Sequence, residues 1–301
     1  MIPQAINDDR QQGIALVLVL WGVTLIAVLA AAFAQSAGIE ARRLGNVVAA
    51  AEAHSRLDEG LAAAVVGLSD ADRARRWRTD GTPYRWNAGD AAIEVAVFAE
   101  TGRIDINRAP PAVLFNLARQ AAGPAGEAVA AAILAQSGRS PDGKPLADAL
   151  QGGARPFLSV VELAALPGMT AAAYRRLAGA VTVHNPGGRL DWRTADATAL
   201  AALPGMTAET AARLVAARRV AEQRQSLYTP DPDLAKILAD GGADSDISQG
   251  DNSVYTMRVT VRTSRRAVAT AEAVVRLTSQ GAADPYRILE WREPAAEEAE
   301  R

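Results

Sequence analysis

Residues 14–34 read IALVLVLWGVTLIAVLAAAFA, a stretch of 21 residues without a single charged side chain. An α-helix of about 20 apolar residues is as long as the hydrocarbon core of a bilayer is thick, roughly 30 Å. This stretch therefore predicts a transmembrane helix, Ile14–Ala34. No proline follows before Pro83, and apolar residues recur every three or four positions over residues 35–69. The pattern predicts that the same helix continues into a soluble half.

A short polar leader, residues 1–13, precedes the apolar stretch and ends at Gly13. A secretory signal peptide is cut after an apolar region of about 7 to 15 residues. Here the apolar region is longer, and cleavage after Gly13 would leave all of it on the mature chain, with Ile14 as the first residue. We expect this processed form rather than an uncleaved signal anchor. The charges on the two sides of the stretch nearly balance, so the positive-inside rule does not set its orientation.

Composition excludes several classes of protein. The 301 residues carry a net charge of −2 and no cysteine, which excludes disulfides, thiolate catalysis and zinc sites built on cysteine. The near-neutral charge gives no global basic field for nucleic acid. The sequence contains no Gly-x-Ser-x-Gly, Gly-x-Gly-x-x-Gly or Walker motif, and we predict that the protein is not an enzyme. One of the two histidines, His54, lies on the apolar stripe of residues 35–69, and we interpret it as a packed histidine without a function.

Strand patterns at both ends of the region after the helix indicate an α+β fold. Apolar residues alternate over 91–98 and again over 255–262, with a return strand at 267–277 and a last short strand at 286–291. Residues 70–90 are interpreted as a connection that carries Trp77 and Trp86. Helical sequence separates the strands, so we expect an antiparallel sheet with a large helical insertion. The predicted parts are sheet at 70–101 and 239–293, an inserted helical domain at 102–238, and a solvated acidic tail at 294–301.

The insertion contains an internal repeat. Residues 102–114, GRIDINRAPPAVL, align without gaps on residues 188–200, GRLDWRTADATAL, which suggests a duplicated unit. The hexapeptide LPGMTA occurs twice, at 166–171 and at 203–208, each time as a hairpin between two helices. In both, a glycine can adopt the left-handed conformation that ends a helix, and a threonine can cap the next helix. These residues are Gly168 and Gly205, and Thr170 and Thr207; Ser159 and Glu162 form a capping box ahead of the first hairpin.

Hairpins of this kind also bind DNA phosphates through backbone amides, so a membrane-anchored DNA receptor with helix-hairpin-helix motifs is the alternative function. Two details weigh against it. Thr170 and Thr207 stand where the DNA-binding hairpin usually has a second glycine, and Glu209 in the first turn of the following helix would repel phosphate. The cations that follow the second hairpin are Arg213, Arg218 and Arg219.

Six aspartates gather in residues 229–252, TPDPDLAKILADGGADSDISQGDN. Oxygen ligands in a flexible, glycine-rich loop suit Ca²⁺, although the spacing is not that of an EF-hand. A solvated acidic loop is the simpler interpretation, and calcium is kept as a possible ligand. The candidate metal ligands are Asp231, Asp233, Asp240, Asp244, Asp246 and Asp251.

Several of these motifs together resemble one family. Gly13 before an apolar helix, GRIDIN at 102–107, the two LPGM hairpins and YRILEW at 286–291 are similar to the type II secretion minor pseudopilin K, the general secretion pathway protein K family. The resemblance extends from Gln11 to Glu293. It implies a type IV pilin-like fold, in which a long N-terminal helix packs on an antiparallel β-sheet and an inserted α-helical domain contains helix-hairpin-helix, SAM-like repeats.

The resemblance also implies a function, processing and partners. A prepilin peptidase would cleave after Gly13 and methylate the new N-terminal residue, Ile14. The glutamate that most pilins carry at the fifth mature position is absent in this family, and here Leu18 stands there. Family members are single-pass proteins of the bacterial inner membrane with a periplasmic C-terminal domain. They form the pseudopilus tip with minor pseudopilins I and J, prime assembly of major pseudopilin G, and are not expected to bind nucleic acid.

Overall fold

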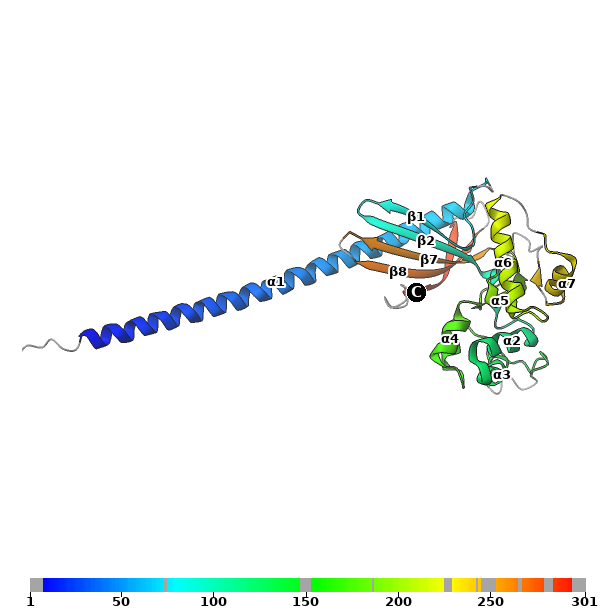
Figure 1. Cartoon of the computed structure of the whole chain (residues 1–301), viewed down its shortest axis with the longest axis horizontal. Coiled ribbons are helices and arrows are strands. Elements are labelled where there is room, and N and C mark those ends of the chain that lie inside the picture. The colour runs from blue at the N-terminus through cyan, green and yellow to red at the C-terminus, as the bar shows by residue number, and fades with distance from the viewer. Residues whose placement is uncertain are drawn as a thin grey trace, which may run out of the picture.

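A five-stranded sheet packs on the second half of a very long helix, and a group of short helices lies at one end of that sheet (Figure 1). This computed structural model describes residues 8–72, 75–146, 153–185, 187–224, 229–241, 243–244, 253–264, 267–278 and 284–293. Within these ranges, the side chains of residues 8–16, 34, 36–39, 41–42, 222–223 and 244 are not described.

Helix α1, Asp8–Ser69, is continuous over 62 residues, as the lack of proline predicts. Its second half has a buried face. Ala53, Leu57 and Leu61 are at most 2% exposed, whereas Leu44 and Val47 on earlier turns are more than 60% exposed. The sheet covers only the later turns of α1 (Figure 1), and for this reason the apolar stripe is buried over part of its length.

The sheet is antiparallel throughout, and its strands lie in the order β1-β2-β7-β8-β9. Since β2 and β7 are neighbours, the inserted segment leaves the sheet and returns to it at its centre. The expected alternation over residues 91–98 is confirmed: Ile93, Val95 and Val97 are at most 1% exposed and pack with α1 in one hydrophobic cluster. The strands are β1 (Asp80–Ala88), β2 (Ala91–Ala99), β7 (Val254–Thr263), β8 (Val268–Leu277) and β9 (Tyr286–Arg292).

Residues 80–88 form an edge strand, where the sequence pattern suggested a connection. Tyr84 and Trp86 belong to alternate positions of β1 on the α1 side, and Trp77 stacks on Tyr84 with 4.1 Å between ring centroids. Gly81 and Pro83 gave this segment the composition of a loop. An edge strand tolerates proline because one side of it has no neighbour to which an N–H must donate.

Two glycines allow α1 to approach its neighbours closely. A Cβ at Gly60 would lie 2.4 Å from Cγ1 of Val259 on β7, and a Cβ at Gly67 would lie 2.4 Å from Cδ1 of Trp77. Any larger residue at either place would have to displace these side chains. Because neither glycine has a side chain, α1 can lie this close to β7 and to Trp77.

The segment between β2 and β7 has a hydrophobic core of its own. Leu114, Leu134, Leu163 and Leu214 are at most 1% exposed within it, and the cluster under α1 contains none of them. The elements are η1 (Glu100–Gly102), β3 (Ile104–Asp105), α2 (Pro111–Ala122), η2 (Gly123–Ala125), α3 (Gly126–Gln136), η3 (Val160–Ala165), α4 (Ala171–Ala178), β4 (Val181–Thr182), β5 (Leu190–Asp191), α5 (Ala197–Ala201), α6 (Ala208–Gln223), α7 (Pro232–Asp240) and β6 (Ala243–Asp244).

Candidate functional site

The N-terminal half of α1 is a long, exposed apolar surface. The large apolar side chains described between Val17 and Phe33 are each more than half exposed, and Leu18 is 67% exposed. Gly13 and Ile14 lie within α1, but their side chains are outside the described set. Water-exposed apolar area of this extent is unfavourable, so this surface requires a covering partner.

The predicted transmembrane helix Ile14–Ala34 is not supported. Over the part of the chain that the structure describes, no helix is long and apolar enough to cross a membrane. Residues 14–16 and residue 34, which complete the predicted span, are among those whose side chains are not described.

Both Pro-Gly hairpins have the geometry that their sequences predict. Gly168 and Gly205 have φ angles of 80° and 79°, the left-handed region that glycine tolerates best. The hydroxyl of Thr170 accepts from the N–H of Ala173 at 3.1 Å, and that of Thr207 accepts from the N–H of Thr210 at 3.1 Å. The capping box of Ser159 and Glu162 is also present.

One of the arginines behind the second hairpin is buried in the fold. Arg218 is 5% exposed, and its Nη1 donates to the carbonyl oxygens of Trp192 at 2.7 Å and Ala195 at 3.0 Å. Glu209 lies in the first turn of α6, as expected. Because one of the three expected cations is buried in the fold, the hairpin offers less positive charge to DNA than the sequence suggested.

The two repeats share one local structure. Asp105 and Asp191 each follow one strand residue and accept from a backbone N–H two residues later, at 2.8 and 2.9 Å. Each also lies in a short parallel pair, with Asp105 opposite Thr182 and Asp191 opposite Asp244. Burial raises the pKa of both aspartates, although the backbone N–H groups favour their ionised forms. These carboxylates organise the turns that follow β3 and β5.

The proposed calcium ligands do not form a described site. Asp231 caps α7 by accepting from the N–H of Leu234, Asp233 is in the first turn, and Asp240 is the last residue of the same helix. Two ends of one helix cannot supply ligands to one ion. Asp246, Asp251 and the side chain of Asp244 lie outside the described residues. Among the residues that are described, no group of three or more acidic or histidine side chains could hold a metal ion.

His54 differs from the expectation of a packed histidine. Its side chain is 53% exposed, Nδ1 donates to the carbonyl oxygen of Ala50 at 3.0 Å, and Nε2 lies 3.1 Å from Glu293 Oε2. These two contacts raise the pKa of His54, the Ala50 hydrogen bond contributing more. The helical periodicity had placed His54 on the buried stripe, but the sheet does not cover this side of α1.

A buried glutamate joins the inserted helices to the sheet. Glu100 is 1% exposed. Its Oε1 accepts from Thr256 on β7 at 2.6 Å and from Arg103 at 3.1 Å, while Oε2 accepts from Thr182 on β4. A buried carboxylate with three donors is costly to displace, because moving it away would break hydrogen bonds inside the fold where water cannot replace them.

A second carboxylate makes a parallel contact from β9. Glu290 lies 3.2 Å from Nε2 of His184 and accepts from Ser159 at 2.9 Å, and both of these partners belong to the inserted segment. The hydrogen bond with His184, aided by Ser159 and Arg292, lowers the pKa of Glu290. Glu100 and Glu290 therefore both hold the segment around Thr182 and His184 against the rest of the chain, and the N–H of His184 donates to Thr182 at 2.9 Å.

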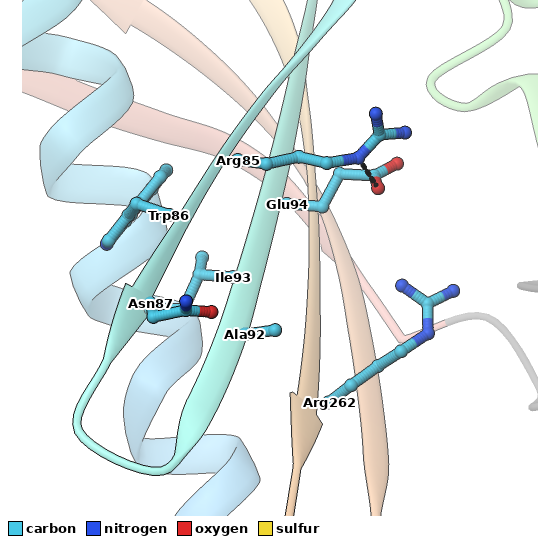
Figure 2. Close-up of a pocket in the computed structure, with 7 residues that line it drawn as sticks. All are labelled: Arg85, Trp86, Asn87, Ala92, Ile93, Glu94 and Arg262. Atoms are coloured by element: carbon cyan, nitrogen blue, oxygen red, sulfur yellow. Dashed lines mark hydrogen bonds and ion pairs between the residues drawn. The ribbon is translucent and has the colours of Figure 1, made fainter.

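A hollow lies on the outer face of the sheet, the face opposite α1 (Figure 2). Its volume is about 310 Å³. Figure 2 shows Arg85 and Arg262 projecting from β1 and β7 to the same side, while Trp86 and Ile93 point to the other side of the sheet. The remaining lining residues are Asn87, Ala92 and Glu94.

Sequence reasoning missed the hollow and both carboxylate contacts. The alternation of Arg258 and Arg262 with apolar residues in β7 is a signal that these arginines share a face. It contains no information on which strand lies beside them, and the pairing of β7 with β2 joins segments that are far apart in the sequence.

No protein-family model matches this sequence, and no curated protein matches it. Among solved structures, the chain is similar to one described as the crystal structure of the GspK-GspI-GspJ complex from the enterotoxigenic Escherichia coli type 2 secretion system. The two share 15% sequence identity, the match covers 86% of this chain and 99% of that chain, and the TM-score is 0.49.

Proposed function

We propose that this protein is a minor pseudopilin of a type II secretion system, a non-enzymatic subunit that forms the tip of the pseudopilus. Its partners would be minor pseudopilins I and J and, below them, major pseudopilin G. The protein would be membrane-associated, with its sheet and inserted helices in the periplasm. Three sequence motifs support this proposal. They are Gly13 ahead of an apolar stretch, GRIDIN at 102–107 and YRILEW at 286–291.

The observation that carries the proposal is the arrangement of α1. One half of this helix packs under the sheet, while the other half, from Val17 to Phe33, extends away from it with its apolar side chains exposed (Figure 1). A helix of this kind is suited to packing against the helices of neighbouring subunits, which would remove its apolar area from water.

The inserted helices support a place at the tip. They lie at the end of the sheet that is farthest from the N-terminal half of α1 (Figure 1). A subunit added above this one would need that space for its own sheet. Leu18 agrees with the same position, because a pilin glutamate at this place is stabilised by the N-terminal amine of a neighbour, and a subunit at the tip requires no such contact.

Processing gives the sharpest test of the proposal. Mass spectrometry of the protein extracted from membranes is expected to show a chain that begins at a methylated Ile14. The Gly13→Glu variant is expected to keep its leader and serves as the control for cleavage. An intact Met1 in the wild-type protein, or a start at another residue, would contradict the proposal.

Assembly gives an independent test. Co-expression of the full chain with minor pseudopilins I and J is expected to yield a complex that co-purifies, and deletion of this chain is expected to stop secretion while the other pseudopilins are still made. Normal secretion in the deletion strain would contradict the proposed function.

The DNA receptor is the weaker candidate. Arg218 is buried, and Glu209 in the first turn of α6 places a negative charge where a phosphate would bind. A receptor would bind duplex DNA with an affinity that falls steeply with salt, by about a thousandfold or more between 50 and 200 mM for six or more phosphate contacts. We expect no such binding by the purified protein, and a steep salt dependence would favour the receptor.

A further inference from the structure

The residues that follow β9 are held against α1. Nε2 of His54 lies 3.1 Å from Oε2 of Glu293, and the indole N–H of Trp291 donates to Oε1 of the same carboxylate at 3.3 Å. The side chains of His54 and Glu293 are both about half exposed. Glu293 directly precedes the acidic tail, residues 294–301, which lies outside the described residues. The tail therefore starts from a fixed point on the surface of α1.

Strand β9 runs toward the exposed half of α1. A Cβ at Gly60 would meet Val259 near the middle of β7, whereas a Cβ at Gly89, in the turn between β1 and β2, would lie 3.7 Å from Nη2 of Arg56. The turn is therefore the end of the sheet nearer to the N-terminal half of α1. β8 begins at this end, and β9 is antiparallel to β8. The chain leaves β9 in the direction of the residues that precede His54.

The side of α1 that precedes His54 is an exposed stripe with a cation at each end. Residues 43, 47, 50 and 54 follow the spacing i, i+4, i+7, i+11, which places them on one face of the helix. Val47 is 66% exposed, and Ala50 is exposed beside it. Arg43 is 75% exposed, and its ion pair with Glu40 is 4.0 Å long. Contacts with Ala50 and Glu293 raise the pKa of His54, which favours its charged form.

The acidic tail has the complementary order of charge. Residues 293–301 read EPAAEEAER, a carboxylate followed by three residues without charge and then by a pair of carboxylates. An extended chain advances about 3.3 Å per residue and an α-helix about 1.5 Å, so five tail residues span the same distance, roughly 16 Å, as eleven residues of α1. In this register Glu298 lies beside Arg43, and Ala296 lies beside Val47.

We infer that residues 294–301 bind back along α1 in an extended conformation, with Glu298 paired to Arg43 and the alanines of the tail over Val47. Exposed ion pairs are weak between separate groups. Here the contact of Glu293 with His54 keeps the tail at a high local concentration beside its site. A partner that packs on this side of α1 would have to displace the tail first. The inference does not depend on the proposed function.

Disulfide trapping in the full-length chain tests the contact. The chain has no cysteine, so one introduced pair reports on one distance, and a disulfide requires Cα atoms about 4.4 to 6.8 Å apart. With a mild oxidant, Val47→Cys with Ala296→Cys is expected to cross-link about tenfold faster than Gly45→Cys with Ala296→Cys, because residue 45 faces the opposite side of the same turn. A Cβ at Gly45 meets nothing within 4 Å, so the control position is open. Equal rates would indicate a solvated tail and overturn the inference.

Isotope labelling identifies the chain that provides the tail. Labelled and unlabelled chains carrying the Val47→Cys and Ala296→Cys pair are mixed before oxidation, and the linked peptides are analysed by mass spectrometry. Both peptides of each pair are expected to come from the same chain. Links between labelled and unlabelled peptides would show that the stripe binds the tail of a second copy, which contradicts the inference.

Charge exchange tests the predicted ion pair. In the chain with both cysteines, Arg43→Glu is expected to slow cross-linking about fivefold, and adding Glu298→Arg to it is expected to restore the rate. Arg175→Glu, at an exposed arginine of the inserted segment, should change the rate by less than about twofold. Circular dichroism confirms that each variant is folded. The same rate for Arg43→Glu and Arg175→Glu would refute the pairing of Arg43 with the tail.

Discussion

Arg139 and Arg218 have the same role in the two halves of the inserted segment. Arg139 donates to the carbonyl oxygens of Ile106 at 2.9 Å and Ala109 at 2.8 Å, and Arg218 donates to those of Trp192 and Ala195. In the aligned repeats, Ile106 corresponds to Trp192 and Ala109 to Ala195. The duplication therefore includes a long-range contact from an arginine outside the aligned residues.

The loss of this contact should destabilise the inserted segment. Arg218→Leu removes the donors of two buried carbonyl groups and is expected to lower the free energy of unfolding by about 2 to 4 kcal/mol. Arg219→Leu, at the exposed neighbouring position, is expected to change it by less than about 0.5 kcal/mol. Urea unfolding measures the free energy of unfolding of both variants. Equal losses would show that the hydrogen bonds of Arg218 do not stabilise the fold.

The packing of α1 on the sheet can be tested at two glycines of the same helix. Gly60→Ala places a methyl group 2.4 Å from Val259 Cγ1 and is expected to cost about 1 to 3 kcal/mol through overpacking. A Cβ at Gly45 meets nothing within 4 Å, so Gly45→Ala is expected to stabilise the helix by about 0.5 to 1 kcal/mol. Thermal unfolding should shift in opposite directions. A stable Gly60→Ala protein would mean that the helix does not lie this close to β7.

The contact of Glu290 with His184 should make stability depend on pH. The folded pKa of Glu290 lies below its ordinary value of 4.5, so the stabilisation is present above pH 4.5 and is lost as pH falls through the lower folded pKa. Glu290→Gln is expected to reduce stability at pH 6 by about 1 to 3 kcal/mol and to match wild type more closely in acid. Denaturant unfolding at several pH values measures this. Glu127→Gln, at an exposed glutamate, serves as the control, and a Glu290→Gln deficit that does not shrink in acid would argue against the contact.

Asp80 gives a second dependence on pH at the start of β1. Burial alone would raise its pKa, but hydrogen bonds from Arg78 at 2.6 Å and from Thr82 lower it to about 2. A carboxylate depressed from 3.8 to about 2 contributes about 2 kcal/mol of stability above pH 4, and loses it as pH falls through 2. Asp80→Asn should therefore be less stable than wild type at pH 7 and nearly equal to it at pH 2. NMR titration of the Asp80 carboxyl carbon checks the pKa directly, and an ordinary value would refute the assignment.

Local signals predicted the local structure of this protein well. The strand at 91–98, the caps at Thr170 and Thr207, the capping box at Ser159 and the left-handed Gly168 and Gly205 all follow from short patterns, because each depends on residues within about four positions. The strand at 80–88 was missed for the same reason: its proline and glycines indicate a loop when no neighbouring strand is known.

Patterns in the sequence were enough to predict a long N-terminal helix, strands with alternating apolar residues at both ends of the region that follows it, and a duplicated helical unit between those strands. The packing of distant segments was needed to show that His54 is half exposed, that Arg218 is buried and donates to backbone carbonyl groups, and that Arg262 lies in a hollow on the outer face of the sheet. The physical reason is the same in each case. Burial and pairing depend on which distant segment packs against a residue, and periodicity along one segment cannot supply that information.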